Sequence, residues 1–280
     1  MPLAIVRGGG DLATGVIYRL WRVGFTVLVL EVPRPMAIRL PVSVAQAIYE
    51  GLHVIGEMRT RRVASVDQTP DDGDVGVLVD PLGTSIAELR PDVLVDAIMA
   101  KRNYGTRKDM APRVIAIGPG FCAPRDVHAV VETLRGHNLG RVITNGEAAP
   151  DTGVPGEIGG ETANRVVRSP AAGIARFAVS IGDRVESGQI IGDVDGMPIE
   201  VKISGVVRGL IHPSVRVAVG MKIGDVDPRA ARENCFSISD KSLAIGGGVL
   251  EAALANFAFR FHPCHIFNHC ETDDKAMRKL

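Results

Sequence analysis

Three consecutive glycines near the amino terminus are the first feature of this sequence whose types and spacing suit chemistry. Gly8, Gly10 and Ala13 follow the pattern Gly-x-Gly-x-x-Gly/Ala, in which the first glycine makes a tight turn and the second lets the backbone approach a pyrophosphate. Free N–H groups and the helix dipole after such a turn favour phosphate. Glu31 follows at a separation where a carboxylate can accept hydrogen bonds from a ribose. The pattern predicts a site for a nucleotide-containing ligand.

Two alternatives to this prediction stay open at the same turn. The glycines can form a tight turn that binds nothing. Asp11 stands at the expected helix start, where its carboxylate can satisfy the N–H groups itself and repel a phosphate. The sequence therefore predicts the turn more firmly than its ligand.

Two further loops follow apolar runs and are expected at the same edge of a sheet. The loop at 99–108 is rich in basic residues, which either neutralise phosphates or form a solvated surface turn. Gly118-Pro119-Gly120 allows the backbone to approach a ligand closely, although such a sequence is also common in ordinary turns. The predicted cofactor site comprises Gly8, Gly9, Gly10, Asp11, Leu12, Ala13, Glu31, Lys101, Arg102, Arg107, Gly118 and Gly120.

No catalytic residue and no metal site is predicted. The histidines ahead of the tail have no convincing acid or base partner in the sequence. The last stretch contains His262, Cys264, His265, His269 and Cys270. These types suit Zn²⁺, but their spacing is unlike that of a standard structural zinc site. We expect a disordered tail there.

The elements that position the glycine turn follow from apolar patterning. A strand at 3–6, a helix at 11–22 and a second buried strand at 25–30 form a βαβ unit. Further strands are predicted at 62–66, 75–79, 92–98, 114–117 and 141–144, with helices at 42–50 and 124–134. This alternation predicts an α/β fold with a Rossmann-like parallel sheet domain over residues 1–168.

An internal repeat marks a second unit over residues 169–230. Gly173 matches Gly205, Arg176 matches Arg208, and residues 191–195 match 223–227. Short β runs separated by glycine turns predict two interlocked halves of a small all-β domain. The first copy resembles the biotinyl and lipoyl carrier domains, which are barrel-sandwich hybrids with a cofactor lysine at a hairpin tip. The corresponding tip here is Gly196-Met197-Pro198, so no covalent biotin or lipoate is predicted.

The carboxyl-terminal part, residues 231–280, contains another glycine run. Ile245-Gly246-Gly247-Gly248 suggests a glycine-rich entry to a helix that extends to about residue 257. We expect this helix to pack back on the first domain.

Composition bounds the function classes. The 280 residues are 46% hydrophobic and 23% charged, which excludes a wholly disordered chain. The 32 basic and 32 acidic residues cancel, so no global field favours nucleic acid or a membrane surface. The absence of a signal core or a long apolar stretch predicts a cytoplasmic protein without a membrane span. Four widely spaced cysteines favour reduced thiols.

Four segments match a known family. These are residues 7–15 (Arg-Gly-Gly-Gly-Asp-Leu-Ala-Thr-Gly), 99–106, 118–133 with Gly-Pro-Gly-Phe, and 238–251 with Ser-Asp-Lys and Ile-Gly-Gly-Gly-Val-Leu-Glu. They resemble the YqeB-type accessory family, which is associated with selenium-dependent molybdenum hydroxylases. The resemblance extends to about residue 257 and implies no established catalytic residue.

The resemblance implies a role in maturing xanthine dehydrogenase-like enzymes, whose cofactor is a molybdopterin, often a dinucleotide. The expected partners are the hydroxylase apoenzyme and other maturation proteins, and the expected ligand is a molybdopterin dinucleotide or another nucleotide, bound non-covalently. Two alternatives stay open: an NAD-dependent oxidoreductase, and a docking scaffold with an empty Rossmann fold.

Overall fold

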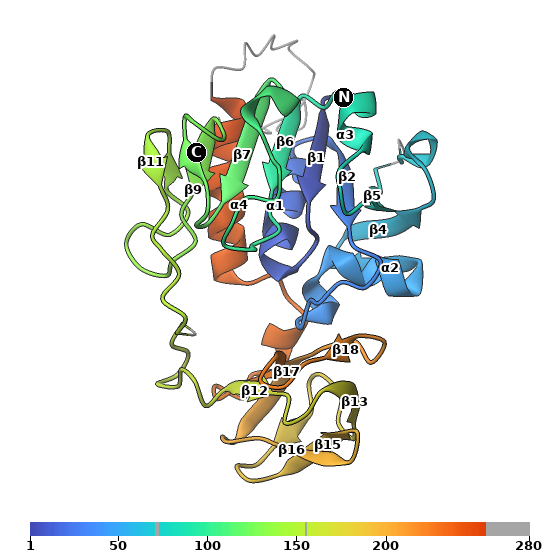
Figure 1. Cartoon of the computed structure of the whole chain (residues 1–280), viewed down its shortest axis with the longest axis vertical. Helices are drawn as coiled ribbons and strands as arrows, with labels where there is room; N and C mark the ends of the chain where they lie inside the picture. Colours follow the sequence, from blue (N-terminus) through green and yellow to red (C-terminus); the bar gives the residue numbers. More distant parts are fainter. Residues whose placement is uncertain (71–72, 155, 256–280) are drawn as a thin grey trace, which may run out of the picture.

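The computed structural model describes residues 1–70, 73–154 and 156–255. The larger of two units is built on a nine-stranded sheet in the order β10-β9-β7-β6-β1-β2-β5-β4-β3 (Figure 1). Its strands are β1 (Leu3–Arg7), β2 (Thr26–Glu31), β3 (Leu52–Ile55), β4 (Met58–Val63), β5 (Val75–Val79), β6 (Val93–Asp96), β7 (Arg113–Ile117), β9 (Ala129–Val131) and β10 (Val142–Ile143). The seven strands from β9 to β4 are parallel, and β10 and β3 pair antiparallel at the two edges. The prediction of an α/β fold with a parallel sheet is confirmed.

Helices cover this sheet unequally. The α-helices are α1 (Asp11–Arg22), α2 (Ala47–Glu50), α3 (Ser85–Leu89) and α4 (Asp240–Leu254), and short 3₁₀ turns lie at Leu40–Val42, Val44–Gln46, Val66–Gln68, Lys108–Met110 and Arg232–Cys235. Side chains of α1 and α4 share one core with Ala4 and Val6 of β1. The alternate residue Ile5 packs in a second core with Ile86 of α3. The two helices therefore cover one face of the sheet, as the alternation of β1 requires.

The long carboxyl-terminal helix lies directly against the first helix of the chain. A Cβ added to Gly15 would overlap the backbone of Ser242, and one added to Gly246 would overlap the carbonyl oxygen of Gly15. Glycine at both positions lets the two backbones approach closely. The predicted return of this helix to the first part of the chain is confirmed.

The glycine run does not open the helix, however. The helix α4 begins at Asp240, where the hydroxyl of Ser239 accepts a hydrogen bond from the amide of Ser242 at 3.2 Å. Gly246 and Gly248 are interior positions that face α1 and Gly140. The prediction of a glycine-rich entry was wrong because these glycines serve helix packing, which a local pattern does not reveal. The tail residues His262, Cys264, His265, His269 and Cys270 lie outside the described residues.

Two other predicted elements differ in the structure. Residues 124–134 contain no helix: 124–128 form a turn and Ala129–Val131 is strand β9, which extends the sheet beside β7. The β-branched pair Val130 and Val131 suits that strand. The helix predicted at 42–50 is reduced to α2 after two 3₁₀ turns. A small antiparallel pair, β8 (Cys122–Ala123) with β11 (Gly146–Glu147), lies beside the main sheet.

The smaller unit contains two antiparallel four-stranded sheets, β12-β19-β17-β14 and β16-β15-β13-β18. The strands are β12 (Val166–Arg168), β13 (Gly173–Phe177), β14 (Arg184–Val185), β15 (Ile190–Val194), β16 (Met197–Glu200), β17 (Gly205–Leu210), β18 (Arg216–Val217) and β19 (Lys222–Asp227). β14 of the first repeat pairs with β17 of the second, and β18 of the second pairs with β13 of the first. The two repeats thus exchange strands around one apolar core.

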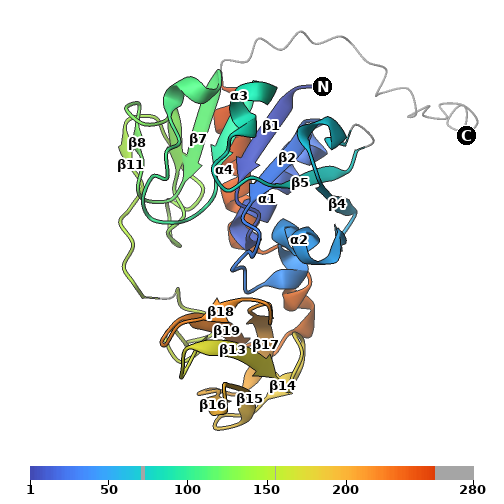
Figure 2. The ribbon, with the colours of Figure 1, turned by 45° about the vertical axis from the view of Figure 1, so that its right-hand side comes forward.

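The two units are joined by two stretches of chain. One descends from the large sheet to β12, and the other rises from the smaller unit to α4 (Figures 1 and 2). The arrowheads of the parallel strands point toward the smaller unit (Figure 1). The carboxyl ends of the strands, where ligands bind in open α/β sheets, therefore face the other unit. Among the described residues, no helix is long and apolar enough to cross a membrane.

Candidate functional site

The glycine turn lies between β1 and α1, and packing requires glycine at its first two positions. Gly8 has a φ of +94°, and a Cβ there would lie 2.9 Å from the carbonyl oxygen of Ala97. A Cβ on Gly9 would lie 2.9 Å from the amide nitrogen of Ala45. The same position on Gly10 has no neighbour within 4 Å. The third glycine therefore faces open space.

The start of α1 is open toward that space. Gly10 is the cap residue, and among the described residues no side chain caps this end of the helix. Asp11 instead pairs with Arg39, whose Nη1 lies 3.3 Å from its Oδ2. Leu12 lines the same space, and Ala13 is buried in the core. The amide groups of the first turn thus stay available to an anion.

Glu31 contacts the backbone of the glycine turn. Its Oε1 accepts a hydrogen bond from the amide of Gly9 at 2.7 Å, and its Oε2 accepts one from the amide of Val32 at 2.8 Å. Burial raises the pKa of this carboxyl, and the two backbone hydrogen bonds oppose the rise. Glu31 does not line the cleft described next, and its contact with Gly9 holds the backbone of the glycine turn. The predicted ribose contact remains a prediction.

A cleft of about 460 Å³ separates the carboxyl edge of the large sheet from the smaller unit. The larger unit contributes Gly10, Asp11, Leu12, Met99, Lys101, Pro119 and Thr133, together with Ile38 and Arg39 from the chain after β2. The smaller unit and its connections contribute Arg165, Arg208, Lys222, Asp225, Ser239 and Lys241. The volume lies in the range of small-molecule and cofactor sites.

The lining of this cleft is strongly basic. It contains seven cations, Arg39, Lys101, Arg135, Arg165, Arg208, Lys222 and Lys241, and three carboxylates, Asp11, Asp151 and Asp225. The difference is a net charge of +4 on a chain whose 32 basic and 32 acidic residues cancel. Each of the three carboxylates already pairs with a cation of the lining. The cleft therefore suits an anionic ligand.

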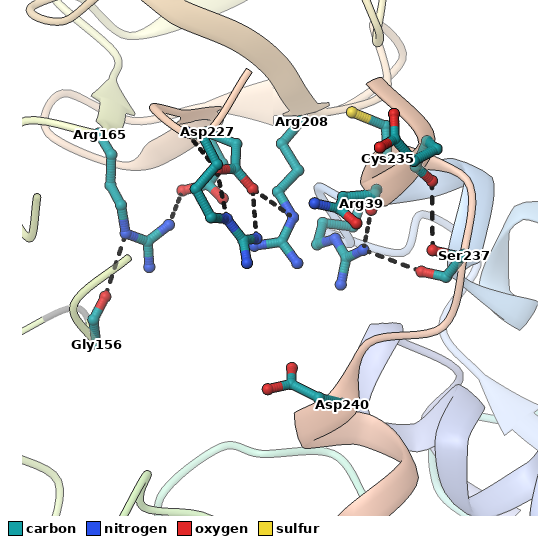
Figure 3. Close-up of polar contacts among 12 residues, drawn as sticks. Arg39, Gly156, Arg165, Arg208, Asp227, Cys235, Ser237 and Asp240 are labelled. Atoms are coloured by element: carbon teal, nitrogen blue, oxygen red, sulfur yellow. Dashed lines mark hydrogen bonds and ion pairs between the residues drawn. The ribbon is translucent and has the colours of Figure 1, made fainter. Parts of the chain in front are cut away.

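Three arginines, Arg39, Arg165 and Arg208, form the arginine cluster of this cleft. Figure 3 shows their guanidinium groups in a row, facing the open space between the smaller unit and Asp240. Arg165 donates to the carbonyl oxygen of Gly156 at 3.2 Å and pairs with Asp225. Arg39 donates to the carbonyl oxygens of Asn234 and Ser237 at 3.1 and 3.3 Å. Backbone contacts thus orient two of the three groups.

Arg208 differs from the other two members of the cluster in lacking a hydrogen bond to a backbone carbonyl among the described residues. Its side chain is 8% exposed, and no described atom accepts a hydrogen bond from its Nε. Burial, followed by the charge of Arg39, lowers the pKa of Arg208. The nearest carboxylate oxygen, on Asp227, lies 3.8 Å from Nε. A buried guanidinium with so few partners has unused capacity to donate hydrogen bonds.

Lys241 enters the cleft from the first turn of α4. Its neighbour Asp240 pairs with Arg135 at 3.1 Å, and among the described residues no carboxylate forms an ion pair with Lys241 itself. Burial, followed by the charge of Arg135, lowers its pKa. A second cation of the lining is therefore available to a ligand.

The three predicted cations of the basic loop at 99–108 lie in different places. Lys101 lines the cleft and pairs with Asp151 at 2.6 Å. Arg102 lies over the ring of Tyr104, 4.5 Å from its centroid, and does not line the cleft. Arg107 pairs with Asp109 at 3.0 Å and lines another cavity, beside α3.

The prediction that these three cations converge was therefore wrong. The cause is the buried residue Thr106, whose hydroxyl contacts Asp96 and Arg7 at 2.5 Å each. This anchor fixes the loop directly before Arg107, and Lys101 and Arg107 line different cavities.

The two predicted glycines of the third loop have a packing role. Gly118 and Gly120 have φ values of +75° and +105°, and Cβ atoms there would lie 2.9 Å from Thr133 and 2.7 Å from the amide of Arg102. Neither glycine lines the cleft, whereas Pro119 between them does. The loop shapes the wall of the cleft.

Sequence reasoning missed Arg39, Arg165, Arg208 and Lys241. One available signal was the repeat. Arg208 matches Arg176 of the first copy, which is 72% exposed and lies 3.9 Å from Asp193. The repeat marks the position, but only the fold shows that the second copy buries its arginine at the cleft.

Comparisons with known proteins give one close relative. The chain is 48% identical, over 255 residues, to the uncharacterized protein YqeB of Escherichia coli K12. The match covers 90% of this chain and 47% of that protein, so the chain spans about half the length of its relative. No family model matches the chain.

Two solved structures were also found at low similarity. An aspartoacylase family protein from Mesorhizobium loti is 11% identical with a TM-score of 0.26, covering 80% of this chain and 84% of that one. A succinylglutamate desuccinylase/aspartoacylase from Rhodobacter sphaeroides is 15% identical with a TM-score of 0.25, over the same shares of the two chains. TM-scores this low support no inference about this chain.

Proposed function

Since this chain is a member of the YqeB-type family over 90% of its length, we propose that it is an accessory protein for the maturation of selenium-dependent molybdenum hydroxylases. In this proposal it binds a nucleotide-containing molybdenum cofactor, a molybdopterin dinucleotide, without a covalent bond. It holds the cofactor until a xanthine dehydrogenase-like apoenzyme receives it.

One observation carries the proposal: the four segments that resemble the family meet at the basic cleft. They contribute Gly10, Asp11 and Leu12, then Met99 and Lys101, then Pro119 and Thr133, and finally Ser239 and Lys241. These segments are far apart in the sequence and come together only in the fold. The motifs that carry the resemblance thus line one cleft, which supports a shared ligand there.

The chemistry of the lining suits a dinucleotide. The net charge of +4 attracts a pyrophosphate, and the open start of α1 adds amide donors and a favourable dipole. Met36, Ile38, Met99 and Leu134 give the same cleft apolar surface for the flat rings of a pterin or a base. Histidine and cysteine are absent from the described lining, which leaves imidazole and thiol chemistry without a side chain there and supports a role in holding a ligand.

We also propose a fold description for the two units. Six of the seven parallel strands, β5-β2-β1-β6-β7-β9, follow the 3-2-1-4-5-6 order of doubly wound dinucleotide-binding sheets, and the parallel strand β4 is added beyond β5. This order supports a Rossmann-like domain over residues 1–168. The strand exchange between repeats supports a barrel-sandwich-hybrid-like domain over 169–230, to which β12 adds a strand just ahead of that boundary. The third proposed segment, residues 231–280, contains α4, which packs on the first domain.

Thermal shift measurements test the proposed ligand. The purified protein is heated with molybdopterin dinucleotide, NAD or cytidine nucleotides at equal concentrations, and the proposal expects the molybdopterin dinucleotide to raise Tm most. A larger shift with NAD would favour an oxidoreductase. No shift with any of them would favour a docking scaffold.

Two substitutions at Gly10 provide matched variants. Gly10 has a φ of −66° and open space around its Cβ position, so both Asp and Asn fit, and both are good helix caps. Gly10→Asp places a negative charge in the cleft, whereas Gly10→Asn adds the same shape without the charge. Both variants should fold, and Gly10→Asp should bind the dinucleotide more weakly than Gly10→Asn.

Co-purification tests the proposed partner. A molybdenum hydroxylase should accompany the tagged protein from cells grown with molybdate. Its absence under those conditions would contradict an accessory role even if the cleft binds a nucleotide.

A further inference from the structure

The arginine cluster carries an inference about where the anion binds, and it begins with the burial of Arg208. The side chain of Arg208 is 8% exposed, and its Nε has no hydrogen-bond acceptor among the described residues. Buried charges in proteins are normally paired and hydrogen-bonded, because an unpaired one loses its hydration without compensation. Arg208, at the wall of a cleft, meets that rule only in part, because it has a distant ion pair with Asp227 but no hydrogen bond from Nε among the described residues.

The carboxylates near Arg208 are already engaged. Asp227 accepts hydrogen bonds from Nε and Nη2 of Arg229 at 3.0 and 2.7 Å, which leaves its contact with Arg208 at 3.8 Å. Asp225 pairs with Arg165 and lies 3.6 Å from Lys222. Four cations thus share two carboxylates, and this region keeps an excess of positive charge.

Arg39 adds a further cation from the other unit. It precedes the 3₁₀ turn at Leu40–Val42 in the larger unit, is 8% exposed, and also has an Nε without an acceptor among the described residues. Its Nη groups are held by Asp11 and by two backbone carbonyls. Two buried guanidiniums from different units therefore face one space, where they repel each other unless an anion lies between them.

We propose that Arg208 and Arg39, flanked by Arg165, bind a phosphate or pyrophosphate group and that this group joins the two units. Guanidinium forks recognise phosphate oxygens with paired, charge-assisted hydrogen bonds, and Arg208, which makes no hydrogen bond to a described residue, has the capacity to donate them, while Arg39 and Arg165 add positive charge beside it. The anion site is then centred on the wall formed by the smaller unit, facing the glycine turn across the cleft. This inference deepens the proposed function, because it names the phosphate contacts of the ligand.

Isothermal titration with inorganic pyrophosphate tests the site without the cofactor. The wild type should bind pyrophosphate, and Arg208→Met should bind it about tenfold more weakly or worse, since charged hydrogen bonds are lost. The matched control is Arg176→Met, at the equivalent, exposed position of the first repeat, which should bind like the wild type. Arg208→Lys keeps the charge but not the fork, and should give an intermediate affinity if Arg208→Met does not fold.

The outcomes distinguish a failure of the proposed anion site from a failure of the proposed function. Equal pyrophosphate binding by wild type and Arg208→Met or Arg208→Lys, or none by the wild type, would overturn the site. If the wild type and Arg208→Met bind molybdopterin dinucleotide equally well, the proposed function stands and this inference fails. If pyrophosphate requires Arg208 but the dinucleotide binds no better than pyrophosphate, the site stands and the proposed function fails.

Discussion

Gly246 of α4 lies so close to Gly15 of α1 that a methyl group on Gly246 would overlap the Gly15 carbonyl oxygen. This contact fixes the position of the helix that carries Lys241 into the cleft. Gly247, the next residue of α4, has open space at its Cβ position. Gly246 therefore has no room for a side chain, whereas its neighbour Gly247 does.

Alanine substitutions at these two positions should have opposite effects. Gly246→Ala should lower the free energy of unfolding by about 1–3 kcal/mol, because the methyl group forces the helices apart. Gly247→Ala should raise it by up to about 1 kcal/mol through helix propensity. Urea denaturation of both variants measures the difference, and a similar effect at both positions would contradict the close helix crossing.

A buried ion pair behind the glycine turn gives a second prediction. Arg7 and Asp96 are both at most 5% exposed and are 3.7 Å apart, with the hydroxyl of Thr106 between them. Arg7→Met should cost about 3–5 kcal/mol of unfolding free energy, because Asp96 stays buried without its partner. The double variant Arg7→Met/Asp96→Asn should recover part of that loss in urea denaturation, and no recovery would show that the arginine acts mainly through packing.

The pH dependence of Glu31 follows from its burial. Because its pKa is raised in the folded state, folding favours the protonated carboxyl, and the contribution of Glu31 to stability is complete only below its unfolded pKa. That contribution is lost as the pH rises through the folded pKa. The stability of Glu31→Gln relative to the wild type should therefore increase from about pH 4 toward neutrality. A difference in unfolding free energy that does not change with pH would contradict this assignment.

Ligand affinity should depend on the protonation of Lys241. Its pKa is lowered by burial and by Arg135, so its charge is lost at a lower pH than that of an ordinary lysine, whose pKa is about 10.4. Pyrophosphate affinity, measured by titration calorimetry between neutral and alkaline pH, should fall across this range in the wild type. Lys241→Arg keeps its charge and should show a smaller fall, whereas identical profiles would exclude Lys241 from the site.

The sequence predicted best where a local pattern determines the structure. The βαβ unit at the amino terminus has apolar runs, a glycine turn and a helical period in one short stretch, and α1 has the predicted bounds 11–22. The repeat likewise predicted the interlocked halves, because β14 and β18 occupy matching positions. Each of these signals lies within a few dozen residues.

The cleft could not be predicted in the same way. Arg39 and Arg208 are 169 positions apart, and neither stands in a glycine turn or a basic run. Their importance comes from burial against another unit, which is a property of the fold. Arg107 shows the converse, since a basic residue in a predicted site loop is turned away by the anchor at Thr106.

The double connection between the units has a consequence for the integrity of the molecule. In the sequence, the smaller unit stands between the strands of the large sheet and the helix α4, which packs on that sheet through its contact with α1. The smaller unit is therefore tied to the larger one by two connections. Most of the described residues in the 150–160 connection are exposed. A single proteolytic cut there breaks one of the two connections and leaves the other intact. The two fragments should therefore stay associated through the contact of α1 with α4 and separate only on denaturation.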